Sequence, residues 1–178
     1  LYGAILNPGC RFFDKRIGQS TTLSGRTIVK HMSAEANKVI TGTYDHVGDA
    51  MIYGDTDSCY FSAYPMLKEG INKGEIPWST ENAIKLYDQV SEAVDGTFVD
   101  FMQTAFHCPK SRSDVIAAGR EIVAKSGLYI TKKRYAALVI DNEGFRTDTD
   151  GKPGKVKAMG LDLRRSDTPV FMQEFLSE

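Results

Sequence analysis

The sequence has few cysteines and no long apolar run, and each of these absences excludes a class of protein. Its three cysteines, Cys10, Cys59 and Cys108, are odd in number and far apart. This argues against a disulfide framework and favours a reducing compartment. No apolar stretch approaches the roughly 20 residues that a membrane span needs. We therefore expect a globular protein without a membrane partner.

The chain also lacks the features of a complete secreted or newly started polypeptide. Its first residues, Leu1 to Ala4, contain neither an initiator methionine nor the basic start of a signal peptide. We take this to indicate a fragment or a processed piece. Its 178 residues, of which 42% are hydrophobic and 25% charged, are enough for one folded domain or slightly more with a core of its own.

A strong net charge is also absent, because the total is −1 at pH 7. The cations are nevertheless concentrated in the last third of the chain. Residues 120–134 and 152–165 each carry five Lys or Arg against one acid, a net charge of +4 in each segment. Such segments are common on solvated faces, but they also suit a surface that binds DNA beside a carboxylate site.

The most informative stretch is Tyr53-Gly54-Asp55-Thr56-Asp57-Ser58. Apolar and aromatic residues precede and follow it, so it predicts the tip of a β-hairpin whose base is buried. Two carboxylates at i and i+2 of such a tip can share a pair of divalent cations, as two-metal phosphoryl transfer requires. A bare Asp-x-Asp would more often be an ordinary surface turn; here the whole hexapeptide is the signal.

The remaining pattern predicts an α+β fold in which helices pack on one face of an antiparallel sheet. A first helix is expected from a cap at Ser20–Thr22 to Ile40, with Thr41-Gly42 as the stop, and a second from a cap at Ser79 or Thr80 to about Ala105. The polar stretch that follows Tyr64-Pro65, up to Pro77, is interpreted as a connection. Strands are expected at residues 49–53, 58–63, 115–118, 121–124, 127–131 and 135–140, with a turn at 141–144.

Three residue groups resemble metal sites but lack the necessary partners. His31 has no second ligand at metal spacing, and His107-Cys108 stand alone, so both are interpreted as structural. The run Thr147–Gly151 contains the Asp-x-Asp-Gly of a calcium loop, but Arg146 and Lys157 occupy positions where such a loop needs oxygen ligands. We interpret it as a polar turn.

The hexapeptide at Tyr53 to Ser58 resembles, at six of six positions, the aspartate-hairpin motif of the family B DNA polymerases. The resemblance implies that Asp55 and Asp57 hold two catalytic Mg²⁺ ions, with Mn²⁺ as a plausible substitute, in a palm domain. It also implies that Tyr53, Gly54 and Thr56 lie against the DNA.

Thr131-Lys132-Lys133-Arg134-Tyr135 is similar to the Lys-Lys-Arg-Tyr motif of the same family, on a strand that contacts the primer–template duplex. Independently of the family, three adjacent cations and an aromatic residue offer phosphate neutralisation and a flat group for a sugar or groove edge. Lys132, Lys133, Arg134 and Tyr135 are therefore DNA-binding candidates.

Weaker similarities cover the rest of the chain. Tyr2-Gly3 matches the close of the fingers-helix motif, which implies contact with the incoming nucleotide and the new base pair. Glu121 falls where these polymerases carry a further acidic residue on a palm strand near the aspartates, which implies a catalytic role. Lys157–Leu161 and Ser166–Pro169 resemble the passage from palm to thumb in the T-even type of phage polymerase. The implied division is palm at residues 1–160, with residues 1–4 closing the fingers, and thumb from residue 161 to 178.

The resemblance implies a DNA-directed DNA polymerase acting on deoxynucleoside triphosphates and primer–template DNA in the cytoplasm of an infected bacterium. The family's further metal-binding aspartate and its triphosphate-binding lysine and arginine have no counterpart here, and neither has its exonuclease domain. We therefore expect this chain to be inactive without the remaining polymerase polypeptide. The alternatives are a non-catalytic nucleic-acid-binding module with a palm-like fold and a two-metal nuclease.

Overall fold

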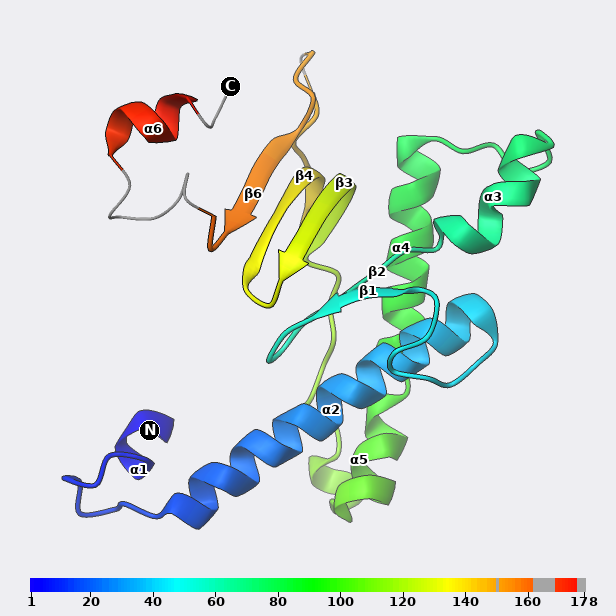
Figure 1. Cartoon of the computed structure of the whole chain (residues 1–178). Helices are drawn as coiled ribbons and strands as arrows, with labels where there is room; N and C mark the ends of the chain where they lie inside the picture. Colours follow the sequence, from blue (N-terminus) through cyan, green and yellow to red (C-terminus); the bar gives the residue numbers. More distant parts are fainter. Residues whose placement is uncertain (150, 162–168, 176–178) are drawn as a thin grey trace. The chain divides into compact units, whose positions relative to one another are not determined.

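The computed structural model describes residues 1–149, 151–161 and 169–175, and it confirms the α+β class with antiparallel strands (Figure 1). The chain divides into two compact units, unit 1 (Leu1–Ser62) and unit 2 (Ala63–Glu178). Within these described ranges, none of the helices has the length and apolarity that a membrane crossing requires.

The elements of unit 1 are α1 (Tyr2–Ile5), α2 (Lys15–Thr41), β1 (Met51–Gly54) and β2 (Cys59–Phe61). Those of unit 2 are α3 (Tyr64–Asn72), α4 (Thr80–Asp95), α5 (Phe98–Phe106), the 3₁₀ turn η1 (Lys110–Arg112), β3 (Ile122–Thr131), β4 (Arg134–Asn142), β5 (Phe145–Arg146), β6 (Lys155–Met159) and α6 (Val170–Phe175).

Helix α2 begins earlier than the sequence pattern predicts. Asp14 is its N-cap: the carboxylate accepts hydrogen bonds from the backbone N–H groups of Arg16 and Ile17. The predicted cap at Ser20–Thr22 lies inside the helix, where both threonine hydroxyls donate to carbonyls four residues earlier. Such back-bonding satisfies hydroxyl groups within a helix, so these residues do not mark its start.

The end of α2 was predicted correctly and lies against the hairpin of unit 1. The helix stops at Gly42, whose φ of 80° lies in the left-handed region that glycine adopts without strain. Residues 31–37 of the helix are buried at every position but one, and α2 packs on β1 and β2. His31 is part of this buried section, and its Nδ1 shares a hydrogen bond of 2.9 Å with the Tyr44 hydroxyl. His31 therefore has a structural hydrogen-bond partner, as predicted.

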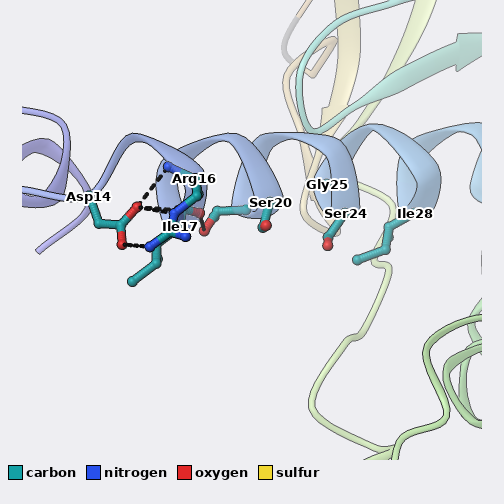
Figure 2. A pocket seen from close by; sticks show the side chains of 8 residues that line it. Asp14, Arg16, Ile17, Ser20, Ser24, Gly25 and Ile28 are labelled. Atoms are coloured by element: carbon teal, nitrogen blue, oxygen red, sulfur yellow. Dashed lines mark hydrogen bonds and ion pairs between the residues drawn. The ribbon is translucent and has the colours of Figure 1, made fainter.

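A hollow lies along the first turns of α2 (Figure 2). Residues of this helix and its cap line it, among them Ser20, Ser24 and Ile28. Its two charged side chains, Asp14 and Arg16, form an ion pair of 3.2 Å, and the Arg16 side-chain hydrogen bonds lower the pKa of the Asp14 carboxyl. The two charges therefore neutralise each other, and Asp14 caps the start of α2.

The helices of unit 2 differ from the prediction in two places. Residues 64–72, most of them interpreted as part of a connection, form α3, with Pro65 in the first turn, where its missing N–H costs nothing. The single helix expected up to Ala105 is broken into α4 and α5 at Gly96. There the Thr97 hydroxyl donates to the Val94 carbonyl at 2.7 Å and competes with continued helical bonding. The predicted cap at Ser79 is confirmed by its bond from the Asn82 N–H.

The strands of unit 2 form one antiparallel sheet in which β4 is central. Strand β3 pairs with one edge of β4, and β5 and β6 pair with the other. The expected strands 121–124 and 127–131 are one continuous strand, whereas 115–118 contains none. Instead, the Ala118 N–H donates to the Asp95 carboxylate of α4 at 2.7 Å, so this segment bonds to a helix. The predicted turn at 141–144 is confirmed; Glu143 and Gly144 both have positive φ, as a two-residue hairpin loop requires.

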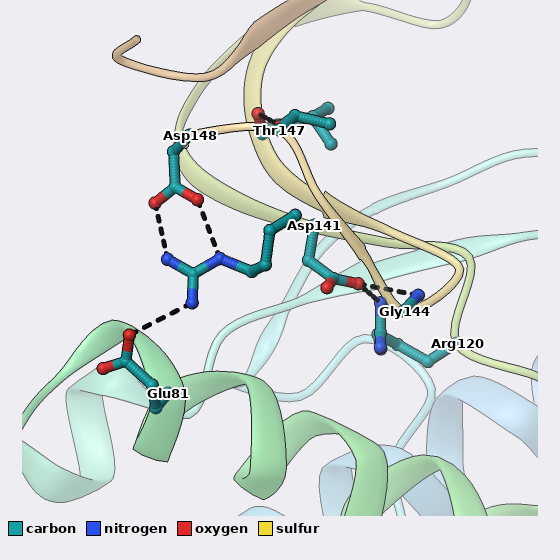
Figure 3. A network of polar contacts seen from close by, with 8 residues as sticks. Glu81, Arg120, Asp141, Gly144, Thr147 and Asp148 are labelled. Carbon is teal, nitrogen blue, oxygen red and sulfur yellow. Dashed lines mark hydrogen bonds and ion pairs between the residues drawn. The ribbon is translucent and has the colours of Figure 1, made fainter. Parts of the chain in front are cut away.

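A polar network joins α4 to the sheet of unit 2 (Figure 3). Asp141 on β4 is 2% exposed; it binds the Arg120 guanidinium and accepts the Gly144 N–H at 3.0 Å. The same guanidinium donates to Asp88 on α4 at 2.6 Å. Arg146 joins the network separately by bonding Glu81 of α4, and its two bonds to Asp148 lower the pKa of that carboxyl. Asp148 is thus occupied by an arginine, in line with the polar-turn interpretation of residues 147–151.

Replacing Arg120 with alanine is expected to lower the free energy of unfolding by about 3–5 kcal/mol, because it leaves the buried Asp141 carboxylate uncompensated. Urea unfolding measures this change. Arg146→Ala is the matched control: its partners are more exposed, so we expect a loss of at most about 1 kcal/mol. Equal losses for the two variants would contradict the role assigned to Asp141.

Candidate active site

The aspartate motif forms the tip of a short antiparallel hairpin in unit 1. Tyr53 pairs with Tyr60 and Gly54 with Cys59, and the Asp55 N–H donates to the Ser58 carbonyl at 2.9 Å, which closes the tip. The Tyr53 and Tyr60 rings lie 5.8 Å apart on the strand pair. The predicted hairpin is therefore confirmed, with shorter strands than expected.

The two carboxylates differ in their surroundings. Asp55 is half-buried, and its Oδ1 accepts the Thr56 N–H at 2.8 Å and the Thr56 hydroxyl at 3.2 Å, so its side chain is held against the turn. Asp57 and Thr56 are exposed. The tip thus offers one oriented and one solvent-facing carboxylate, both of them hard oxygen ligands.

These carboxylates fit part of a Mg²⁺ site. Mg²⁺ is typically bound through one or two carboxylates, with water and substrate phosphates completing its octahedral coordination. Among the described residues, no group of three or more His, Cys, Asp or Glu side chains is arranged to hold a metal ion. The hairpin would therefore supply two ligands of such a site, and other oxygen atoms would have to supply the rest.

The base of the hairpin is buried against α2. Ala50, the residue before β1, is 2% exposed, and its carbonyl accepts the N–H of Ser62, the residue after β2, at 2.8 Å. Burial raises the pKa of the Cys59 thiol, and a hydrogen bond with Ser33 of α2 opposes this shift. Cys59 therefore stays a neutral packing group at neutral pH.

Tyr2 and Gly3, the nucleotide-binding candidates, lie in the four-residue helix α1 of unit 1. The Tyr2 hydroxyl shares a hydrogen bond of 2.7 Å with the Thr22 hydroxyl of α2. Both residues are exposed. This anchors Tyr2 to α2, the helix that also packs on the hairpin.

The basic motif lies at a turn of unit 2. Lys132 and Lys133 form the two-residue loop between β3 and β4, with Thr131 paired to Arg134. Lys133 has a φ of 62°, a conformation that non-glycine residues rarely adopt. All three cations are exposed, so the turn presents three positive charges to solvent, as phosphate binding requires.

The basic turn lies beside the segment Lys157–Leu161, which also resembles a polymerase motif. Strand β6 pairs with β4 so that Met159 lies opposite Tyr135, and the Arg134 side chain donates to the Gly160 carbonyl at 3.2 Å. Gly160 has a φ of 63°, and a Cβ atom there would collide with the Lys133 carbonyl oxygen. The glycine of the Lys-x-Met-Gly-Leu segment therefore permits the close approach that fixes the basic turn.

Replacing Gly160 with alanine is expected to lower the free energy of unfolding by about 1–3 kcal/mol, because the new methyl group meets backbone that cannot yield cheaply. Gly119→Ala, where a Cβ would have open space, is the control and should stay within about 0.5 kcal/mol of the parent. Urea unfolding of both variants measures the difference. Equal stabilities would mean that the approach at Gly160 is not tight.

Tyr135 lies beneath the turn. Its ring is 4% exposed and stacks on Tyr129 with 5.6 Å between centroids and 22° between planes. The Tyr129 ring lies over Gly127, where a Cβ would come within 2.7 Å of it. Burial, with a smaller electrostatic contribution from the neighbouring Tyr135, raises the pKa of Tyr129 to about 12. The stacked pair lies on β3 and β4 next to the basic turn. The DNA contact of Tyr135 stays a prediction.

Glu121 precedes β3 in unit 2 and is exposed. Its carboxylate forms an ion pair of 2.5 Å with Lys157 of β6, and its carbonyl accepts the Glu143 N–H at 2.7 Å. Its catalytic role stays a prediction. The similar passage at Ser166–Thr168 lies outside the described residues, and α6 follows it.

Comparison with known proteins gives a consistent result. The chain is 31% identical over its whole length to the DNA-directed DNA polymerase of Escherichia phage RB69, of which it covers 20%. It is 27% identical to the DNA-directed DNA polymerase of Enterobacteria phage T4, again over the whole chain and 20% of that protein. A DNA polymerase of Methanocaldococcus jannaschii is 26% identical over 94% of the chain and 8% of its own length. No protein-family model matches.

The resemblance derived from the motifs is therefore confirmed from one end of the chain to the other. The chain spans about one fifth of the length of these phage relatives. This resemblance extends beyond the short motifs to the helices and strands that carry them.

Proposed function

The chain is homologous over its full length to one segment of the phage DNA-directed DNA polymerases, and on that premise we propose that it carries catalytic carboxylates of a family B polymerase palm. Such a protein transfers nucleotides to a primer 3′-hydroxyl as the template directs. The observation that carries the proposal is the pair Asp55 and Asp57 at the tip of a hairpin closed by the Asp55–Ser58 hydrogen bond. A closed tip fixes where the carboxylates can lie, as positioning of reactive groups requires.

In this proposal Asp55 and Asp57 hold two Mg²⁺ ions, or Mn²⁺ in their place. Such ions, when bound, lower the pKa of the 3′-hydroxyl and stabilise charge on the triphosphate. The protein's own contribution is to hold Asp55 oriented through its two bonds from Thr56 and to leave Asp57 open to solvent and substrate. By its resemblance to the family motif, Glu121 of unit 2 is proposed as a further catalytic acidic residue.

The substrate-binding residues follow the same proposal. The exposed cations of the turn at Lys132 and Lys133, with Arg134, bind the primer–template backbone, and the hairpin residues Tyr53, Gly54 and Thr56 lie against it. Phosphate contacts provide affinity with little sequence preference, which suits an enzyme that copies any template. Tyr2 and Gly3 contact the deoxynucleoside triphosphate.

The palm comprises residues 1–160, of which 1–4 close the fingers, and the thumb starts at 161, where α6 is one of its helices. Two carboxylates at the tip are too few for two ions, so the remaining polymerase polypeptide supplies further ligands and the triphosphate-binding cations. The chain alone is then inactive. Its place of action is the cytoplasm of an infected bacterium.

Primer extension tests the proposal, with the chain supplied together with the remaining polymerase polypeptide on four templates that differ in the first coding base. We expect extension that requires Mg²⁺ or Mn²⁺ and adds the nucleotide complementary to each template. Metal-dependent cleavage of the DNA without extension would favour a nuclease. Metal-independent DNA binding with neither reaction would favour a binding module.

A further inference from the structure

The base of the aspartate hairpin is tied to α2 by one buried amide. Asn37 is 1% exposed, and its Oδ1 accepts the N–H of Ala50, the residue directly before β1, at 3.1 Å. Its Nδ2 donates to the Thr43 carbonyl at 2.8 Å and to the Thr41 hydroxyl at 3.1 Å. One side chain thus bonds the end of α2, the loop after it and the start of the hairpin.

The geometry around this amide leaves little freedom. The Ala50 carbonyl accepts the Ser62 N–H across the base of the hairpin. Because the N–H of the same Ala50 is bonded to Asn37, the side chain is connected to both strands through this one residue. Gly48 packs directly on the amide, and a Cβ atom there would collide with Asn37 Nδ2. A buried amide with both of its ends bonded is costly to leave unpaired, so it specifies one arrangement of the loop.

We infer that Asn37 is a positioning residue for Asp55 and Asp57, and that Gly48 is required because it leaves room for the Asn37 amide. The metal-related part of this inference rests on the proposed function. The tip lies only five residues from Ala50 along β1, so a shift of the hairpin base is carried to the carboxylates. Displacements of about 1 Å can cost about 10²-fold in a reactive site.

Hydrogen exchange of the backbone N–H groups of Ala50 and Asp55 tests the positioning directly. We expect Asn37→Ala and Gly48→Ala each to accelerate exchange at both groups by about tenfold or more. Because the two changes disrupt the same contact, the double variant should exchange no faster than Asn37→Ala, whereas independent effects would multiply. Multiplicative effects, or unchanged exchange in Asn37→Ala, would overturn the inference.

A second variant covers the case in which Asn37→Ala does not fold. Asn37→Asp keeps an oxygen for the Ala50 N–H but cannot donate to the Thr43 carbonyl, so exchange should rise at the loop and less at Ala50. Ala36→Gly is the control for general weakening of α2, because it destabilises the same helix and leaves the amide in place. The two variants are compared at equal free energy of unfolding. If Ala36→Gly then accelerates exchange at the Asp55 N–H as much as Asn37→Asp does, the role of Asn37 is merely structural and the inference fails.

Mn²⁺ broadening of the NMR signals of residues 54–58 links the inference to the metal site. The Mn²⁺ concentration for half-maximal broadening should rise about tenfold in Asn37→Asp and stay unchanged in Ala36→Gly. Asp55→Asn and Asp57→Asn separate the two hypotheses. If these two variants leave the broadening unchanged, the metal proposal fails while the exchange results still decide the role of Asn37.

Discussion

Replacing Asp55 or Asp57 with asparagine is expected to lower the rate of primer extension by about 10³-fold or more while leaving the fold intact. The substitution keeps the size of the side chain and removes its charge, so the hairpin closed by Asp55 and Ser58 can still form. Under the proposed function, the substitution removes a charged oxygen ligand for a divalent ion. The charge stabilisation by such an ion is worth several kcal/mol, and each 1.36 kcal/mol is tenfold in rate. Single-turnover extension, with the chain supplied together with the remaining polymerase polypeptide, measures the loss.

Asp49→Asn is the matched control. Asp49 is exposed, lies in the same unit and precedes the hairpin, so the same change in charge there should alter the rate by less than about threefold. Near-normal extension by Asp55→Asn or Asp57→Asn would show that the hairpin carboxylates are dispensable. Loss of extension in all three variants would point to a general charge effect instead.

Removing the three charges of the basic turn is expected to weaken duplex binding strongly and to flatten its dependence on salt. Each phosphate contact contributes about 0.9 to the slope of log K against log salt. The triple alanine variant of Lys132, Lys133 and Arg134 should therefore have a slope smaller by about 2–3. Fluorescence anisotropy with a primer–template duplex, measured from low to moderate salt, determines both affinity and slope.

The control for this prediction removes the same charge elsewhere in unit 2. Lys68, Lys73 and Lys85 are exposed on or beside α3 and α4, and their triple alanine variant should keep the slope within about 0.5 of the parent. Equal loss of slope in both variants would mean that the duplex responds to total charge and not to the turn.

The aspartate hairpin could be predicted from sequence because its signal is local. The run Tyr53 to Ser58 combines turn residues with apolar flanks, and such a pattern fixes a hairpin whatever surrounds it. The turn at 141–144 was predicted for the same reason. Errors arose where the local pattern does not reveal the hydrogen bonding. The hydroxyls of Thr21 and Thr22 bond within α2, although the pattern predicts a cap there. The apolar stripe predicts one helix, whereas the helix is interrupted at Gly96, beside the bond from the Thr97 hydroxyl to the Val94 carbonyl.

The supporting residues of the candidate site were not predicted, because their roles depend on distant partners. Asn37 is one polar residue in a helix, and only the folded chain brings Ala50 and Gly48 to its amide. Gly160 belonged to a recognised segment, but its contact with the Lys133 carbonyl follows from the pairing of β4 with β6. Aligning the β3–β4 hairpin about its two-residue loop would place Ile130 opposite Tyr135, and only the register shift between Tyr129 and Thr131 brings Tyr129 there.

The most direct test of the central claim is to locate Mn²⁺ on this chain by the broadening of its backbone NMR signals. The account predicts that low concentrations of Mn²⁺ broaden the signals of Gly54 to Ser58 first, and that Asp55→Asn and Asp57→Asn each remove this effect without altering the hairpin. Broadening that begins elsewhere, or that persists at the hairpin in both variants, would contradict the assignment of Asp55 and Asp57 as the metal-binding carboxylates.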